Sequence, residues 1–284
     1  MECIADVQAI LGEGPTWVAR EAALYWVDIV GKKMFRWSEA EGTRIWDVPV
    51  HVSTLAPRAG GGFIGAGHDG FLAFEFGAGV TLLGNPESGR ESNRFNDGKV
   101  DRAGRFWAGT MDRHEQQTSG ALYRLGSTLE SALVDDGYHV TNGPAFSLDG
   151  RKMYHTDSAL QRIYAFDLAD DGGVTNRRVF AQFGEGQGYP DGMTVDAEDC
   201  LWIAFWDGWC VRRLSPAGEP IAELEVPAQR PTSVAFGGPD LDRLFVTSAR
   251  RDLTAKELES QPCAGGLFMT VPGVRGVAEP HFAG

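Results

Sequence analysis

The sequence predicts an all-β fold, a six-bladed β-propeller, from three observations. Apolar segments are short, rich in aromatic and β-branched residues, and separated by Gly, Asp, Asn and Pro, a pattern typical of strands and turns. Helical periodicity is nearly absent. The segments form repeats whose openings lie 39 to 49 residues apart, the spacing of propeller blades that contain four antiparallel strands each.

Each repeat supplies the strands of one blade in order. The repeats open on the inner strands at Glu13, Val52, Asn96, Asn142, Asp191 and Thr232. Aromatic second strands are predicted over residues 23–29, 62–67, 105–110, 152–157, 201–206 and 243–248. Third strands follow after a turn at residues 33–37, 71–76, 121–125, 162–166, 210–214 and 266–271. Fourth strands are predicted at residues 43–49, 80–84, 130–135, 176–183 and 221–227.

The last repeat lacks a fourth strand of its own. The N-terminal residues 2–7 can supply it, pairing with the last hairpin and closing the ring so that no sheet edge stays open. Residues 249–266 have no strand pattern, and we expect an excursion within the last blade that contains a helical turn. No linker or low-complexity segment divides the chain, so residues 1–284 are predicted to form a single propeller domain.

The composition excludes several classes of partner. The chain has 39 acidic and 26 basic residues and a formal charge of −13, which repels nucleic acid and anionic membranes. No apolar run reaches the roughly 18 residues that a membrane-spanning helix needs. The N-terminus has no secretory pattern, and the four cysteines are scattered, as suits a reducing compartment. We therefore expect a cytoplasmic protein without nucleic-acid or membrane partners.

The opening residues of the repeats indicate a metal site. Inner strands line the centre of a propeller, so equivalent positions of successive blades converge there. Glu13, Asn96, Asn142 and Asp191 carry side-chain oxygens, an all-oxygen set that favours Ca²⁺, Mg²⁺, Mn²⁺ or Fe²⁺, while Zn²⁺ is less natural but not excluded. Three or four protein ligands leave positions open for water or substrate, which indicates catalysis.

Two of these positions have a simpler interpretation. Asn142-Gly143 and Asp191-Gly192 could each be an ordinary turn dipeptide. Their registration with Glu13 and Asn96 at one blade position favours the shared site. Arg94 lies two residues before Asn96 and could either hydrogen-bond a polar ligand or form a surface salt bridge.

The motifs resemble the SMP-30/gluconolactonase/regucalcin-like family of sugar lactonases. The resemblance covers essentially the whole chain and rests on the segments LGEGPTW, NRFNDGKVDRAGRFWAGTM, GALYRL, TNGPAFSLDGRKMYHTDS, YPDGMTVDAEDCLWIAFWDG and HFAG. It implies a six-bladed propeller with one divalent cation held by Glu13, Asn142 and Asp191. It also implies that Arg94 and Asn96 contact the substrate, which moves Asn96 from the metal set to the substrate set. Asp112, His114 or Glu115 could supply a further substrate contact after Met111, and the resemblance leaves that choice open.

The implied activity is hydrolysis of an aldonolactone to the aldonic acid, a reaction of carbohydrate metabolism. The cation would polarise the lactone carbonyl, and Asp191 would accept a proton from the attacking water. Calcium-dependent hydrolysis of phosphotriesters or aryl esters is an alternative, as is a non-enzymatic calcium-binding propeller. The natural lactone and metal cannot be read from the sequence, and we expect a monomer.

Overall fold

The computed structural model describes residues 1–284 and contains six sheets, each of four antiparallel strands. The predicted fold class, an all-β six-bladed propeller with four strands per blade, is confirmed. The chain divides into two compact units. The first comprises Met1–Asp47 and Phe183–Ala278, and the second comprises Val48–Gln182 and Glu279–Gly284.

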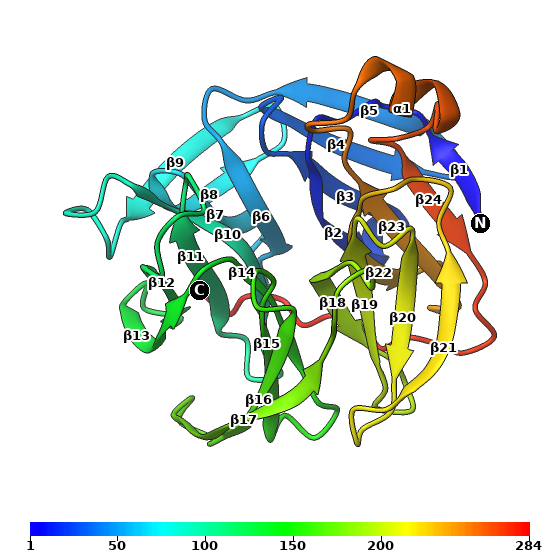
Figure 1. The fold of residues 1–284 in the computed structure, drawn as a ribbon. Coiled ribbons are helices and arrows are strands. Elements are labelled where there is room, and N and C mark those ends of the chain that lie inside the picture. Colours follow the sequence, from blue (N-terminus) through cyan, green and yellow to red (C-terminus); the bar gives the residue numbers. More distant parts are fainter. The chain divides into compact units, whose positions relative to one another are not determined.

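The first unit contains three sheets, with strand orders β2-β3-β4-β5, β18-β19-β20-β21 and β1-β24-β23-β22 (Figure 1). A short 3-10 helix connects β2 to β3 at Ala19–Glu21. The strands are β1 (Glu2–Ala5), β2 (Gly12–Val18), β3 (Ala23–Asp28), β4 (Lys33–Ser38), β5 (Gly42–Asp47), β18 (Tyr189–Val195), β19 (Leu201–Trp206), β20 (Cys210–Leu214), β21 (Pro220–Glu225), β22 (Pro231–Gly237), β23 (Arg243–Ser248) and β24 (Leu267–Thr270).

The N-terminal strand completes the last blade, as the sequence predicted. β1 lies beside β24 in Figure 1, and the antiparallel register pairs Glu2 with Met269 and Cys3 with Phe268. Between β23 and β24 the expected excursion contains helix α1 (Ala255–Ser260), which begins with a reciprocal cap between Thr254 and Glu257. Neither helix has the length and hydropathy of a membrane span.

The second unit also contains three sheets, formed by β6 to β9, β10 to β13 and β14 to β17, each in sequence order. The strands of the last sheet, β14 to β17, are labelled in the lower part of Figure 1. The strands are β6 (Val52–Pro57), β7 (Phe63–Gly67), β8 (Gly70–Glu75), β9 (Gly79–Gly84), β10 (Asn93–Val100), β11 (Phe106–Asp112), β12 (Gly120–Leu125), β13 (Ser131–Tyr138), β14 (Thr141–Phe146), β15 (Lys152–Asp157), β16 (Arg162–Leu168) and β17 (Val174–Gln182).

The burial of the strands follows their place in the blade. Every residue of β3 is buried, whereas β5, the outer strand of the same blade, contains only exposed and partly buried residues. Strands covered on both faces are continuously apolar, and outer strands with one wet face alternate. In this blade the ring of Trp26 stacks on Phe35, with 4.9 Å between the ring centroids.

Two buried aspartates tie the turn between the first and second strands to the blade core, one in each unit. Asp196 accepts hydrogen bonds from Trp202 Nε1 and Arg213 Nε, both at 2.8 Å, and from two backbone N–H groups. Asp101 accepts the same set of bonds, from Trp107 Nε1 at 2.8 Å, an arginine Nε and two backbone N–H groups. Both carboxylates are fully buried, so these bonds replace their hydration.

Candidate functional site

A β-bulge interrupts the inner strand of every blade at the predicted repeat position. In each pairing of a first with a second strand the register shifts by one residue, which bends the inner strand and re-aims its side chains. The bulges lie at or directly after the six predicted positions, Glu13, Val52, Asn96, Asn142, Asp191 and Thr232.

The six positions are not all equivalent, because the bulges differ by one residue in where they begin. Glu13 and Asn142 are the last paired residues before a Gly-Pro bulge, whereas Asn96 and Asp191 lie inside theirs. The interpretation of Asn142-Gly143 and Asp191-Gly192 as ordinary turn dipeptides is wrong, since they lie within strands β14 and β18.

The first unit supplies two carboxylates. Glu13 in β2 and Asp191 in β18 are each only 6% exposed. The Gly14 backbone N–H donates to Glu13 Oε2 at 3.1 Å, and Gly14 has a positive φ of 57°. After Asp191 the chain passes so close to its neighbour that a Cβ on Gly192 would lie 2.1 Å from Ser233 Oγ. Only glycine fits there.

The second unit supplies the amides. Asn142 in β14 is 4% exposed, and its side chain is fixed at both ends. Its Nδ2 donates to Ser158 Oγ at 2.8 Å, and its Oδ1 accepts from Asn96 Nδ2 at 3.0 Å. These partners assign the oxygen and nitrogen of the Asn142 amide, because a flipped amide would place two N–H donors against each other.

Arg94 and Asn96 are buried together in β10. Arg94 Nη1 donates to Asn96 Oδ1 at 2.7 Å and to the Phe95 carbonyl at 3.0 Å. Arg94 is 8% exposed, which contradicts the interpretation of Arg94 as a surface salt-bridge residue. Asn96 Nδ2 also donates to the Thr141 carbonyl at 2.8 Å. Asn96 is therefore bonded to the predicted metal ligand Asn142, and Arg94 is connected to that ligand through Asn96.

Asp97, for which the sequence suggested no role, joins the same network. Its Oδ1 accepts from the Gly98 N–H at 2.7 Å, and its Oδ2 accepts from the Gly143 N–H at 3.0 Å. Burial raises the pKa of the Asp97 carboxyl to about 6, although these two bonds and the Lys99 charge pull it down.

The structure distinguishes the three candidate residues that follow Met111, namely Asp112, His114 and Glu115. Asp112 is 2% exposed, and its Oδ2 accepts from the Gln116 N–H at 2.9 Å. This bond and others from the loop backbone lower the Asp112 pKa, so its carboxylate serves the loop. His114 and Glu115 are exposed, and Glu115 has a positive φ of 58°.

Two further aspartates hold the segments that lead into Glu13 and Asn142. Asp28 accepts from the backbone N–H groups of Ile10 and Leu11 at 2.8 and 3.0 Å. Asp157 does the same for residues 139 and 140, at 3.0 and 3.3 Å. Sequence reasoning missed both, although each ends a second strand at the same place in its repeat.

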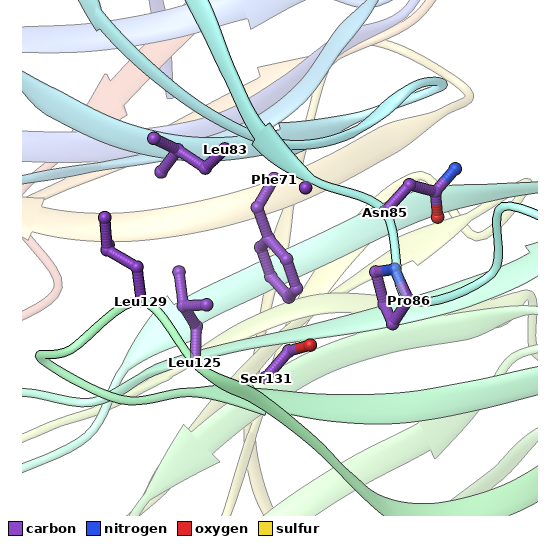
Figure 2. Close-up of a pocket in the computed structure, with 8 residues that line it drawn as sticks. Phe71, Leu83, Asn85, Pro86, Leu125, Leu129 and Ser131 are labelled. Atoms are coloured by element: carbon purple, nitrogen blue, oxygen red, sulfur yellow. The ribbon is translucent and has the colours of Figure 1, made fainter.

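A separate apolar pocket of about 140 Å³ lies in the second unit, next to β8 and β12. Figure 2 shows Phe71, Leu125 and Leu129 among its lining side chains. It contains no ionisable side chain and none of the predicted site residues. Acid-base or metal chemistry does not belong there.

Comparison with known proteins supplies the family. Residues 11–250 match the model of the SMP-30/gluconolactonase/LRE-like region. The chain belongs to the SMP-30/gluconolactonase/LRE-like family. Within this family it is 38% identical to the 6-deoxy-6-sulfogluconolactonase of Pseudomonas putida, over all of this chain and 99% of that protein. It is 35% identical to regucalcin of Homo sapiens, over all of this chain and 98% of that protein.

Solved structures of the SMP-30/gluconolactonase/LRE-like family have the same fold. The crystal structure of regucalcin, a calcium-binding protein from Agrobacterium tumefaciens, matches with a TM-score of 0.94 at 30% identity, over 99% of this chain and 96% of that one. A luciferin-regenerating enzyme matches with a TM-score of 0.92 at 31% identity, over 99% and 98% of the two chains. The predicted family membership is confirmed.

Proposed function

We propose that the protein hydrolyses a sugar lactone to the corresponding aldonic acid with the help of one divalent cation. The observation that carries this proposal is the burial of oxygen donors at the bulges, namely the carboxylates of Glu13 and Asp191 and the amide of Asn142. The relative from Pseudomonas putida, a lactonase by name, supports the substrate class.

The donor set suits a hard cation. Two carboxylates and one amide oxygen match Ca²⁺, Mg²⁺, Mn²⁺ or Fe²⁺ better than Zn²⁺, which prefers nitrogen and sulfur. Carboxylates as buried as Glu13 and Asp191 need compensation for their lost hydration, and a cation would provide it. When bound, the cation would polarise the lactone carbonyl and stabilise the negative charge that develops on attack.

We propose further roles in the reaction for three residues, Asp191, Arg94 and Asn96. Asp191 is proposed as the general base that accepts the proton of the attacking water. Arg94 is proposed to hydrogen-bond the hydroxyl groups of the sugar and to orient the ester, because its guanidinium carries several donors in a fixed plane. Asn96 would support Arg94 through the bond between them.

Metal removal and reloading test the proposed function. The apoprotein is expected to lose roughly a thousandfold or more of its lactonase activity, since a cation contributes several kcal/mol to such a transition state. Reloading with Ca²⁺, Mn²⁺, Mg²⁺, Fe²⁺ and Zn²⁺ in turn should restore it. The panel comprises glucono-, xylono-, arabinono-, galactono- and 6-deoxy-6-sulfogluconolactone. Equal turnover by apoprotein and reloaded protein would contradict cation dependence, and no turnover of any lactone would contradict the lactonase.

Calcium binding without catalysis is a second candidate function, favoured by the likeness to the calcium-binding regucalcin. Calorimetry and turnover separate the two, because a binding protein would take up Ca²⁺ and leave every lactone intact. An aryl ester and a phosphotriester in the same panel test the remaining hydrolase alternative. A monomer and a cytoplasmic location stay predictions.

Replacing Arg94 with alanine is expected to raise KM about 10- to 100-fold, the worth of a hydrogen bond from a charged donor. The metal affinity of the apoprotein, measured by calorimetry, should stay unchanged. Arg90→Ala is the matched control, since Arg90 is an exposed arginine shortly before the same strand. A loss of metal affinity with an unchanged KM would remove Arg94 from the substrate site.

A further inference from the structure

We propose that Asn96 and Asp97 are positioning residues that clamp the bulge of β14 and aim the Asn142 oxygen at the cation. This inference rests on the proposed function for the cation and gives Asn96 a second role, toward Asn142, beside its bond with Arg94. All residues of the clamp lie in the second unit.

The carboxylate of Asp97 connects two bulges. One oxygen holds the Gly98 N–H in its own strand, and the other holds the Gly143 N–H, the residue directly after Asn142. A bulge leaves backbone groups outside the sheet ladder, and these need partners when they are buried. Asp97 supplies them and thereby fixes the backbone that carries Asn142.

Both N–H groups of the Asn96 amide have partners within the protein. Its Nδ2 donates to the Thr141 carbonyl and to Asn142 Oδ1, and its Oδ1 accepts from Arg94. A primary amide has two N–H donors, and both have partners here. Asn96 could donate to a substrate hydroxyl only by releasing Asn142 or the Thr141 carbonyl.

The amide of Asn142, by contrast, retains capacity on its oxygen. Ser158 accepts from its nitrogen, which keeps the oxygen on the side of Asn96. A carbonyl oxygen has two lone pairs, and the bond from Asn96 occupies one. The second lone pair is suited to a cation. Outer partners that orient a metal ligand typically change metal affinity about 10- to 100-fold when they are removed.

The test compares metal affinity and KM across matched variants. Apoprotein calorimetry with Ca²⁺ and Mn²⁺ should show about 10- to 100-fold weaker binding for Asn96→Ala and for Asp97→Asn. Asn96→Ala should not reproduce Arg94→Ala, which is expected to raise KM alone. Asn93→Ala is the control for general loosening of β10, because this buried asparagine bonds Glu87 and the Ser119 carbonyl instead. It should keep wild-type metal affinity.

Two further measurements keep the proposal falsifiable if a strand variant folds poorly. Ser158→Ala removes the other anchor of the Asn142 amide from outside the strand, and it should also weaken metal binding. In Asp97→Asn the Gly143 amide should exchange with deuterium faster than in the wild type. Wild-type metal affinity in all three variants, or a raised KM alone in Asn96→Ala, would overturn the inference.

Glu13→Gln distinguishes failure of the inference from failure of the proposed function. If the wild type binds no cation, or binds it equally well with Glu13→Gln, the proposed metal site is wrong and the clamp has no cation to serve. If Glu13→Gln abolishes binding while Asn96→Ala and Asp97→Asn keep it, the metal site stands and the clamp is wrong.

Discussion

Asp191→Asn is expected to leave the fold intact and to reduce turnover about a thousandfold, within the range of roughly 10²- to 10⁴-fold that general base catalysis contributes. The substitution keeps the volume of the side chain and one oxygen that can face the cation. It removes the carboxylate that would accept the water proton. Initial rates on the preferred lactone, measured at saturating metal, give the effect on kcat directly.

The matched control for this variant is Asp199→Asn, in a turn of the same blade. Asp199 has a positive φ of 59°, a conformation that asparagine adopts readily, so the same chemical change should be harmless there. The two variants should unfold at similar urea concentrations. A wild-type rate in Asp191→Asn would exclude Asp191 as the base, and lost metal binding in that variant would show that its charge serves binding instead.

The fold could be predicted from the sequence because each blade has a local pattern of strand and turn residues. The second strands are aromatic or β-branched, and the turns between them contain Gly, Asp and Asn, so each blade could be placed separately. The N-terminal strand was predicted from what the last repeat lacked. Its pairing with β24 confirms that argument.

The place of the candidate residues in the repeats could be predicted from the sequence, but their hydrogen-bond partners could not. Equivalent places in the repeats gave Glu13, Asn96, Asn142 and Asp191 as candidates, and the family resemblance reduced the proposed metal ligands to three. A spacing of 46 residues cannot tell whether Asn96 turns toward a ligand or toward Asn142, since that depends on where each bulge begins. The bond between these two amides became visible only with the register of both strands.

Asp28 and Asp157 could have been identified from the sequence, because they occupy equivalent places in two repeats. Both end a second strand, and both accept two N–H groups from the segment that leads into a predicted ligand. A repeat comparison over second strands as well as first strands would have found the pair. The loop after Met111 offered no such repeat, and the role of Asp112 in that loop could not have been predicted.

The largest effect on stability is expected from Asp196→Ala, with Asp101→Ala as the same change in the other unit. Removing one partner of a buried ion pair costs up to about 3–5 kcal/mol. Arg213 would keep only Glu198, which is exposed, as its acidic partner. Asp196 satisfies an arginine, a tryptophan and two backbone N–H groups, and a methyl group would replace none of these bonds. Urea unfolding followed by tryptophan fluorescence measures the loss, with Trp202 and Trp107 as local reporters.

Ser147→Ala is the reference variant with which the loss of stability in Asp196→Ala and Asp101→Ala is compared. Ser147 occupies the corresponding turn of the β14–β15 hairpin, where its hydroxyl accepts from the Lys152 N–H at 2.9 Å and donates to Asp149. The bond from Lys152 is neutral and the Asp149 carboxylate is exposed to solvent, so their loss costs about 1 kcal/mol. If Asp196→Ala and Asp101→Ala were no more destabilising than Ser147→Ala, the buried carboxylates would not have the stabilising role expected of them. The donors around each carboxylate argue against that result. Only the arginines have a further acceptor, Glu198 for Arg213 and the Asp170 carbonyl for Arg105, so the tryptophan and the two backbone N–H groups would lose their partner.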